Sequence, residues 1–209
     1  MKVKSLIVNA ITFFRVPLIL AWMVLAVVHE YCGGFWAGFS ALTAMFLSGL
    51  SDLIDGMLAR KWRVVSTLGK MADPLMDKIF YVVAFPTLVW ILARQGESDA
   101  HTLLMLCFTI LYLVRDMWVT FMRSVGTMYG ADVAAMWIGK VRTALSFPCA
   151  GWTYTYLAFH TWDVLPASWS FPWLVTCFAF EGFLILLTLI SAFTYTVSYL
   201  PYLKKALSR

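Results

Sequence analysis

Long apolar runs separated by short polar connections dominate the chain. Six runs reach the length of about 20 residues that a helix needs to cross a bilayer, and they cover residues 9–29, 35–60, 69–94, 101–123, 134–160 and 171–200. The connections carry turn signals such as Gly33-Gly34 and Gln95-Gly96. The pattern predicts an all-α polytopic membrane protein with six transmembrane helices in a single domain over residues 1–209. The residues before Asn9 are expected to form a short interfacial segment.

The composition excludes most other classes of protein. The chain is 62% hydrophobic and 13% charged, whereas soluble domains are about half apolar and about a quarter charged. Because no basic cluster is interleaved with exposed aromatic residues, we expect no nucleic-acid partner. The first apolar run lacks a small-residue cleavage site and is expected to be retained as a helix. The four cysteines lie in apolar stretches without metal-ligand spacing and are expected to be buried thiols: Cys32, Cys107, Cys149 and Cys177.

The positions of lysine and arginine predict the orientation in the membrane. With six spans, both termini share a side with the second and fourth connections. The opposite side has only Arg94 in its connections. Basic residues accumulate on cytoplasmic loops, so both termini are predicted to be cytoplasmic. The basic residues on the predicted cytoplasmic side are Lys2, Lys4, Arg60, Lys61, Arg63, Lys70, Arg123, Lys140, Arg142, Lys204, Lys205 and Arg209.

Four aspartates flank the basic second connection. Asp52 and Asp55 are three residues apart on the second predicted helix, and Asp73 and Asp77 are four apart on the third, so each pair shares a helix face. Two neighbouring helices joined by a short loop can direct both pairs at one point. Ionised acids at a membrane edge are expensive unless they are paired or coordinated. Oxygen-only ligands suit two hard divalent cations, Mg²⁺ or Mn²⁺, which could clamp a phosphate-transfer centre.

These aspartates belong to a longer spaced motif. It reads Asp52-x2-Asp55-Gly56-x2-Ala59-Arg60-x8-Gly69-x3-Asp73-x3-Asp77. This pattern resembles the signature of the CDP-alcohol phosphatidyltransferase family, with every motif position filled. The family's six-helix fold also agrees with the predicted topology, so the resemblance extends over nearly the whole chain. It implies a metal-dependent membrane enzyme of phospholipid biosynthesis that acts on a CDP-linked lipid.

The resemblance also implies roles for the motif residues. Asp52, Asp55, Asp73 and Asp77 would bind two divalent metals, and Asp77 would also be the base that takes the proton from the acceptor hydroxyl. The residues implied in binding the cytidine diphosphate are Gly56, Ala59, Arg60 and Gly69. The chemistry of these residue types agrees, because glycine and alanine allow close approach to the backbone and the planar fork of arginine suits phosphate oxygens. A homodimer is implied by the resemblance alone.

Other charges inside apolar runs bear on the acceptor. Arg115 and Asp116 lie within the fourth run, and Arg123 follows eight residues after Arg115, on roughly the same side of a helix. The fifth run begins with Gly139-Lys140-x-Arg142-Thr143. Such cations are expensive in lipid unless they face a polar site. The residues predicted to bind the phosphate of an acceptor are Arg115, Arg123, Lys140 and Arg142.

A secondary resemblance narrows the choice of the acceptor alcohol. Asn9-x2-Thr12-x2-Arg15, the Arg115-Asp116 pair and the start of the fifth run are similar to those of bacterial phosphatidylglycerophosphate synthases. That subgroup transfers the phosphatidyl group of CDP-diacylglycerol to sn-glycerol 3-phosphate in the bacterial inner membrane. Inositol phosphate, serine and phosphatidylglycerol remain alternative acceptors. A divalent-cation transporter is a more remote alternative, because its acids would lie at mid-membrane in two corresponding halves.

Glu181 has no role in either resemblance. It lies in the last apolar run, where an acid is expensive. Two interpretations remain open from the sequence. Glu181 either pairs with a cation of another helix or lines the path of the lipid or the acceptor.

Overall fold

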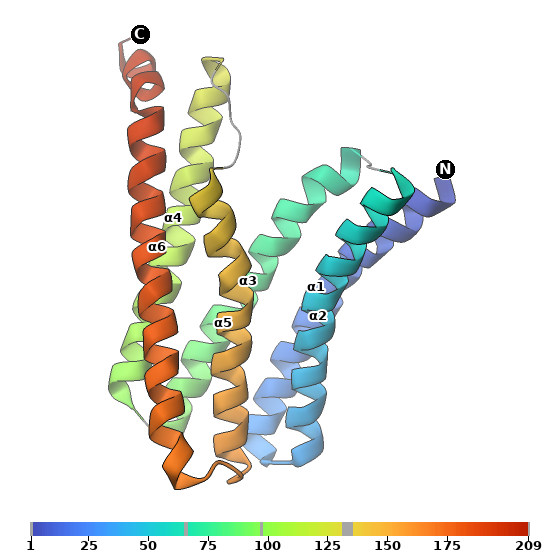
Figure 1. Ribbon diagram of the computed structural model, residues 1–209, viewed down its shortest axis with the longest axis vertical. Helices are drawn as coiled ribbons and strands as arrows, with labels where there is room; N and C mark the ends of the chain where they lie inside the picture. The colour runs from blue at the N-terminus through green and yellow to red at the C-terminus, as the bar shows by residue number, and fades with distance from the viewer. Residues whose placement is uncertain (1, 65–66, 97, 131–135, 209) are drawn as a thin grey trace. The chain divides into compact units, whose positions relative to one another are not determined.

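A computed structural model describes residues 2–64, 67–96, 98–130 and 136–208, except for the side chains of residues 2, 67, 68, 70, 71, 73 and 167 (Figure 1). Within these ranges the secondary structure is six α-helices. They are α1 (Lys2–Cys32), α2 (Phe35–Trp62), α3 (Thr67–Gln95), α4 (Asp99–Met128), α5 (Trp137–Thr161) and α6 (Ala167–Leu207). The prediction of an all-α polytopic membrane fold is confirmed. Residues 2–8 form the first turns of α1, which continues unbroken through them.

Five of the helices that the structure describes are long and apolar enough to cross a membrane, and α5 is not among them. With 25 residues α5 has the required length, but Lys140, Arg142 and many tyrosine, tryptophan and threonine side chains lower its hydropathy. The membrane crossing of α5 therefore stays a prediction. The predicted turns at Gly33 and Gly96 are confirmed, since both residues have a φ of 64° that favours glycine.

The chain divides into two compact units, each described here by itself. Unit 1 is Met1–Glu97 with Ala150–Phe171, and unit 2 is Ser98–Cys149 with Pro172–Arg209. In unit 1, α1 packs along α2 and α3 (Figure 1). The second half of α5 joins this unit, where Trp22 and Tyr154 meet edge to face with ring centroids 5.3 Å apart. A single domain over 1–209 stays a prediction.

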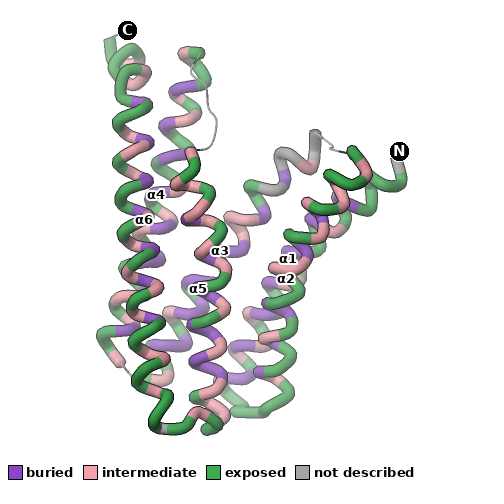
Figure 2. Tube along the Cα trace, in the orientation of Figure 1, coloured by how far each residue is buried: buried purple, intermediate pink, exposed green. Residues whose placement is uncertain are grey.

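Buried residues form one stripe along each long helix (Figure 2). On α1 the stripe recurs at alternating steps of four and three residues: Val8, Thr12, Arg15, Ile19, Trp22, Ala26 and His29. On α4 the same steps connect His101, Met105, Phe108, Tyr112, Arg115, Val119, Met122 and Gly126. A repeat of 3.5 residues is typical of helices packed at small crossing angles, as in membrane bundles.

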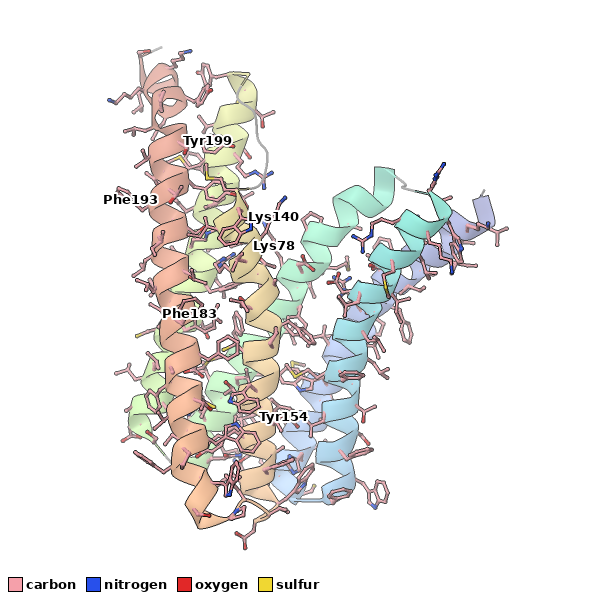
Figure 3. All side chains as sticks on the ribbon, in the orientation of Figure 1. Lys78, Lys140, Tyr154, Phe183, Phe193 and Tyr199 are labelled. Carbon is pink, nitrogen blue, oxygen red and sulfur yellow. The ribbon has the colours of Figure 1, made fainter. Side chains whose placement is uncertain are left out.

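On α6 the stripe is more polar than the rest of the helix. Glu181, Thr188 and Ser191 are buried, while the large side chains of Phe183 and Phe193 are exposed (Figure 3). An apolar outer surface around a partly polar interior is the arrangement expected when the surrounding solvent is lipid. The prediction of four buried thiols is half wrong. Cys149 and Cys177 are buried, whereas Cys32 and Cys107 lie on exposed helix faces.

Candidate active site

An arginine on the buried stripe of α1 contacts the motif aspartates. Arg15 Nη2 lies 2.5 Å from Asp52 Oδ1 and 3.2 Å from Asp55 Oδ2, and Nη1 lies 2.8 Å from Asp77 Oδ1. Only 4% of the Arg15 side chain is exposed. Among the described side chains, one guanidinium thus joins carboxylates of α2 and α3. Asp52, Asp55 and Asp77 are brought together at one point of unit 1.

The three carboxylates differ in their access to solvent. Asp55 is the buried member, with 7% of its side chain exposed, whereas Asp52 is 54% and Asp77 40% exposed. The Thr12 hydroxyl donates a hydrogen bond of 2.7 Å to Asp55 Oδ2. The cluster therefore has a buried side that faces α1 and an accessible side formed by Asp52 and Asp77. A ligand approaching from solvent would meet Asp52 and Asp77 first.

The carboxylate oxygens of this cluster are the type of ligand that suits hard divalent cations. The carboxylates supply oxygen ligands only, which Mg²⁺ and Mn²⁺ prefer, and they already converge on a cationic group. Within the described residues, no group of three or more acidic, histidine or cysteine side chains is spaced to hold a metal ion directly. The predicted ligand Asp73 lies on α3, but its side chain lies outside the described residues. The metal ligands stay predictions.

The residues predicted to bind the nucleotide lie beside the aspartates on the same two helices. Arg60 is exposed in the last turn of α2, and Ala59 and Gly69 are half-buried. A Cβ added at Gly56 would meet only Arg60 Nη2 within 4 Å, at 3.9 Å. The backbone at Gly56 therefore borders open space next to a cationic side chain. This is the arrangement that close approach of a diphosphate requires.

Two of the predicted acceptor-binding cations form a second cluster in unit 2. Asp116 Oδ1 accepts from Arg142 Nη2 at 3.0 Å and from Arg115 Nη1 at 3.3 Å. The Arg142 guanidinium also stacks over the Tyr112 ring, 3.8 Å from its centroid. Arg142 is 1% exposed, so this cluster lies inside the packed helices. Arg123 is half-buried on α4, and Lys140 is exposed on α5 (Figure 3).

Residues of α6 hold Arg115 from the other side. Arg115 Nη2 donates a short hydrogen bond to Ser191 Oγ, and its guanidinium carbon lies 5.1 Å from the centroid of the Tyr195 ring. A Cβ added at Gly139 would lie 3.3 Å from Arg115 Nη2. The sequence analysis missed Ser191 and Tyr195. Their spacing on the α6 stripe is the signal that would have indicated them.

The second cluster has more positive charge than its carboxylate can balance. The described contacts join two guanidinium groups to one aspartate. Within the described part of the chain, Arg115 Nε and Arg142 Nε and Nη1 are buried without a hydrogen-bond partner. Unused buried donors are expensive, and an anion would satisfy them. Because Arg142 is covered, an anion would need neighbouring side chains to move before it could reach these donors.

Glu181 pairs with a histidine of another helix. Its Oε1 lies 3.0 Å from His101 Nε2, and both side chains are buried in unit 2. The ring of His101 also lies against Phe178, with centroids 5.1 Å apart. Glu181 therefore has a side-chain partner on another helix, and both interpretations of its role stay predictions. His101 was not singled out from the sequence.

Comparison with known proteins places this sequence in a family. The sequence model described as CDP-alcohol phosphatidyltransferase matches residues 5–187. The chain belongs to the CDP-alcohol phosphatidyltransferase family. The match begins before Thr12 and includes all four motif aspartates, Arg115 and Arg142. The match thus includes the charged residues of both clusters and ends before Ser191 and Tyr195.

Individual relatives carry the names of two different enzymes. A CDP-diacylglycerol–glycerol-3-phosphate 3-phosphatidyltransferase of Mycoplasma genitalium is 34% identical over 122 residues, covering 56% of this chain and 46% of the relative. One of the same name from Cereibacter sphaeroides is 34% identical over 133 residues, covering 64% and 54%. A CMP-forming cardiolipin synthase of Streptomyces coelicolor is 29% identical over 157 residues, covering 70% and 66%. The chain therefore spans between about half and two thirds of the length of these curated relatives.

Proposed function

We propose that this chain transfers the phosphatidyl group of CDP-diacylglycerol to sn-glycerol 3-phosphate, releasing CMP and forming phosphatidylglycerol phosphate. The observation that carries the proposal is the convergence of Asp52, Asp55 and Asp77 on one point. Membership of the CDP-alcohol phosphatidyltransferase family supports the reaction class. The relatives named for glycerol 3-phosphate support that acceptor.

The motif residues have distinct roles in this proposal. The four aspartates Asp52, Asp55, Asp73 and Asp77 would hold two divalent cations, Mg²⁺ or Mn²⁺. When bound, such cations supply polarisation of the diphosphate and balance charge that develops in the transition state. Arg60 binds the diphosphate, and Gly56, Ala59 and Gly69 allow the nucleotide to approach the backbone. Asp77 takes the proton of the acceptor hydroxyl, and its partial exposure is compatible with access by that hydroxyl.

The cluster around Asp116 supports an acceptor that carries phosphate. Arg115 and Arg142 exceed the charge of Asp116, and their unused donors suit an anion. Arg123 and Lys140 would guide the acceptor toward them as outer cations. A neutral alcohol such as free inositol would leave the excess charge and the buried donors unsatisfied. That this cluster and the aspartates serve one reaction is part of the proposal.

Phosphatidylglycerol is the second candidate acceptor. It is favoured by the similarity of this chain to the relative from Streptomyces coelicolor, which is named a CMP-forming cardiolipin synthase. Phosphatidylglycerol also carries a phosphate, so the cluster around Asp116 suits either acceptor. We also propose that the enzyme lies in the inner membrane of a bacterium, because the relatives described above are bacterial. The positions of lysine and arginine support termini and an active site on the cytoplasmic side. A homodimer is part of the same proposal.

Release of CMP from the purified chain in lipid nanodiscs tests the function. CDP-diacylglycerol is supplied with one acceptor at a time: glycerol 3-phosphate, phosphatidylglycerol, inositol phosphate or serine. The proposal expects CMP release with glycerol 3-phosphate, loss of that release with EDTA, and recovery with Mn²⁺ or Mg²⁺. Release with phosphatidylglycerol alone would transfer the assignment to the second candidate, and release with none of the four would refute both.

Asp77→Asn tests the proposed base. The substitution keeps the size of the side chain and removes its ability to take a proton, so we expect CMP release to fall by at least about 100-fold. Asp99→Asn is the matched control, because Asp99 is an exposed acid outside the motif in the first turn of α4. Wild-type release by Asp77→Asn would exclude Asp77 as the base.

A further inference from the structure

Two polar residues of α1 contact the carboxylates that are proposed to bind metal, and neither belongs to the aspartate motif. We propose that Thr12 and Arg15 are positioning residues that fix which carboxylate oxygens turn toward the bound cations. The inference rests on the proposed metal-dependent function. In this inference α1 orients metal ligands that belong to α2 and α3.

The hydroxyl of Thr12 is committed to Asp55. It lies 2.7 Å from Asp55 Oδ2 and 3.2 Å from the carbonyl oxygen of Val8. A hydroxyl has one proton to donate, and the shorter contact is to the charged acceptor, so the hydrogen bond goes to the carboxylate. Thr12 is 2% exposed, which keeps water from competing for this bond. The hydroxyl therefore sets the rotation of the Asp55 carboxylate.

Arg15 acts on the same oxygen and on two further carboxylates. Asp55 Oδ2 also accepts from Arg15 Nη2, at 3.2 Å. With two donors from α1 on Oδ2, Oδ1 of Asp55 is directed away from α1. Arg15 also donates to Oδ1 of Asp52 and Oδ1 of Asp77. One rigid fork thus sets the spacing between the carboxylates of α2 and α3, as groups behind metal ligands commonly do.

The local charge remains suited to divalent cations. The contacts of Arg15 join one guanidinium to three carboxylates, which reduces the repulsion between these carboxylates. A competing interpretation is that the guanidinium occupies the place of a cation and must leave when metal binds. The two interpretations predict opposite effects of weakening Arg15 on metal affinity.

Mn²⁺ binding without substrate separates the two interpretations. Free Mn²⁺ is measured by electron paramagnetic resonance with the full chain in nanodiscs. Thr12→Val removes the hydroxyl, and Arg15→Lys removes the planar guanidinium. Both variants keep the charge of the cluster. We expect each to raise the Kd for Mn²⁺ by about 10–100-fold, the usual effect of losing a group that orients a metal ligand. Thr12→Ser, which retains the hydroxyl, should restore binding to within a few-fold of wild type.

Thr43→Val is the matched control. Thr43 is an exposed threonine of α2 whose hydroxyl donates to the carbonyl of Phe39 at 2.8 Å. This variant loses the same hydroxyl without touching the cluster, so its Kd should equal that of wild type. In the activity assay, Thr12→Val should raise the Mn²⁺ concentration needed for half-maximal CMP release by the same factor as its Kd.

The outcomes separate this inference from the proposed function. An unchanged or lower Kd in both Thr12→Val and Arg15→Lys overturns the inference, and a lower Kd in Arg15→Lys favours the competing interpretation. If the wild type binds Mn²⁺ and the variants weaken that binding, but no acceptor releases CMP, the inference stands and the proposed reaction fails. If the wild type binds no Mn²⁺, both fail.

Discussion

Asp116→Asn would leave two buried guanidinium groups in unit 2 without the carboxylate between them. Asp116 Oδ1 accepts from both Arg115 and Arg142. The described contacts of this cluster carry a net charge of about +1, and the substitution raises it to about +2 in a site where charges are poorly screened. The asparagine keeps the shape of the side chain, so packing is nearly unchanged. The effect on stability therefore reports the loss of the counter-charge.

The expected loss of stability in Asp116→Asn follows from the burial of the ion pairs that Asp116 makes. Removing one member of a buried ion pair costs about 3–5 kcal/mol. The Asp116 side chain is 24% exposed, so water reaches the site in part and the lower end, about 3 kcal/mol, applies. For a chain of this size a loss of about 3 kcal/mol corresponds to a fall of roughly 6–12 °C in Tm. Asp116→Glu keeps the charge with a longer reach and should recover most of that loss.

A double substitution separates electrostatics from packing. Arg142→Met removes one cation and leaves Arg115 paired with Asp116. Combined with Asp116→Asn, it returns the cluster to the wild-type net charge of about +1. We therefore expect the double variant to be more stable than the sum of the two single losses predicts, by at least about 1 kcal/mol.

Thermal unfolding of the full chain in nanodiscs, followed at one fixed scan rate, measures these differences. A fixed rate is needed because membrane proteins often unfold irreversibly and the apparent Tm then depends on the rate. The reasoning is refuted if Asp116→Asn unfolds within about 2 °C of wild type. It is equally refuted if the losses of the single variants add in the double variant.

Two further substitutions, one of them with a matched control, test close approaches at glycines. Gly38→Ala places a Cβ 2.6 Å from Trp162 Cζ2 and should destabilise the chain by about 1–3 kcal/mol. The control is Gly151→Ala, whose added Cβ meets nothing within 4 Å and should leave Tm unchanged or raised. Equal Tm changes in the two variants would contradict the packing around Gly38. Gly139→Ala places a Cβ 3.3 Å from Arg115 Nη2, so under the proposed function it should raise KM for glycerol 3-phosphate several-fold while the chain stays folded; an unchanged KM would argue against a role of Arg115 in acceptor binding.

The helices and the family were predictable because both depend on local patterns. Apolar runs long enough to cross a bilayer must form helices in lipid, where backbone groups have no other partners. Helix ends were less predictable. The last helix runs from Ala167 to Leu207, beyond the predicted 171–200, because its polar ends continue the helix outside the apolar run. The spaced aspartate motif indicated the family through its resemblance to the family signature, and the family match confirms that membership.

The periodicity of α1 also indicates which of its polar residues are buried. Thr12 and Arg15 lie on the 3.5-residue stripe with Ile19 and Trp22, so their burial could be predicted from the α1 sequence. Polar residues on such a stripe need polar partners. The stripe indicates which face is buried and does not identify the partner, because the partner lies on another helix.

Only the tertiary structure decided the pairings. Arg15 meets Asp77 across 62 residues of sequence, and Glu181 meets His101 across 80. The sequence analysis grouped four cations by their common helix ends, whereas the described contacts join Arg115 and Arg142 to Asp116. A contact depends on the rotation and height of two packed helices, which are set by the whole interface. The sequence by itself determined the helices, their membrane environment and the family, and packing determined which charges share a site.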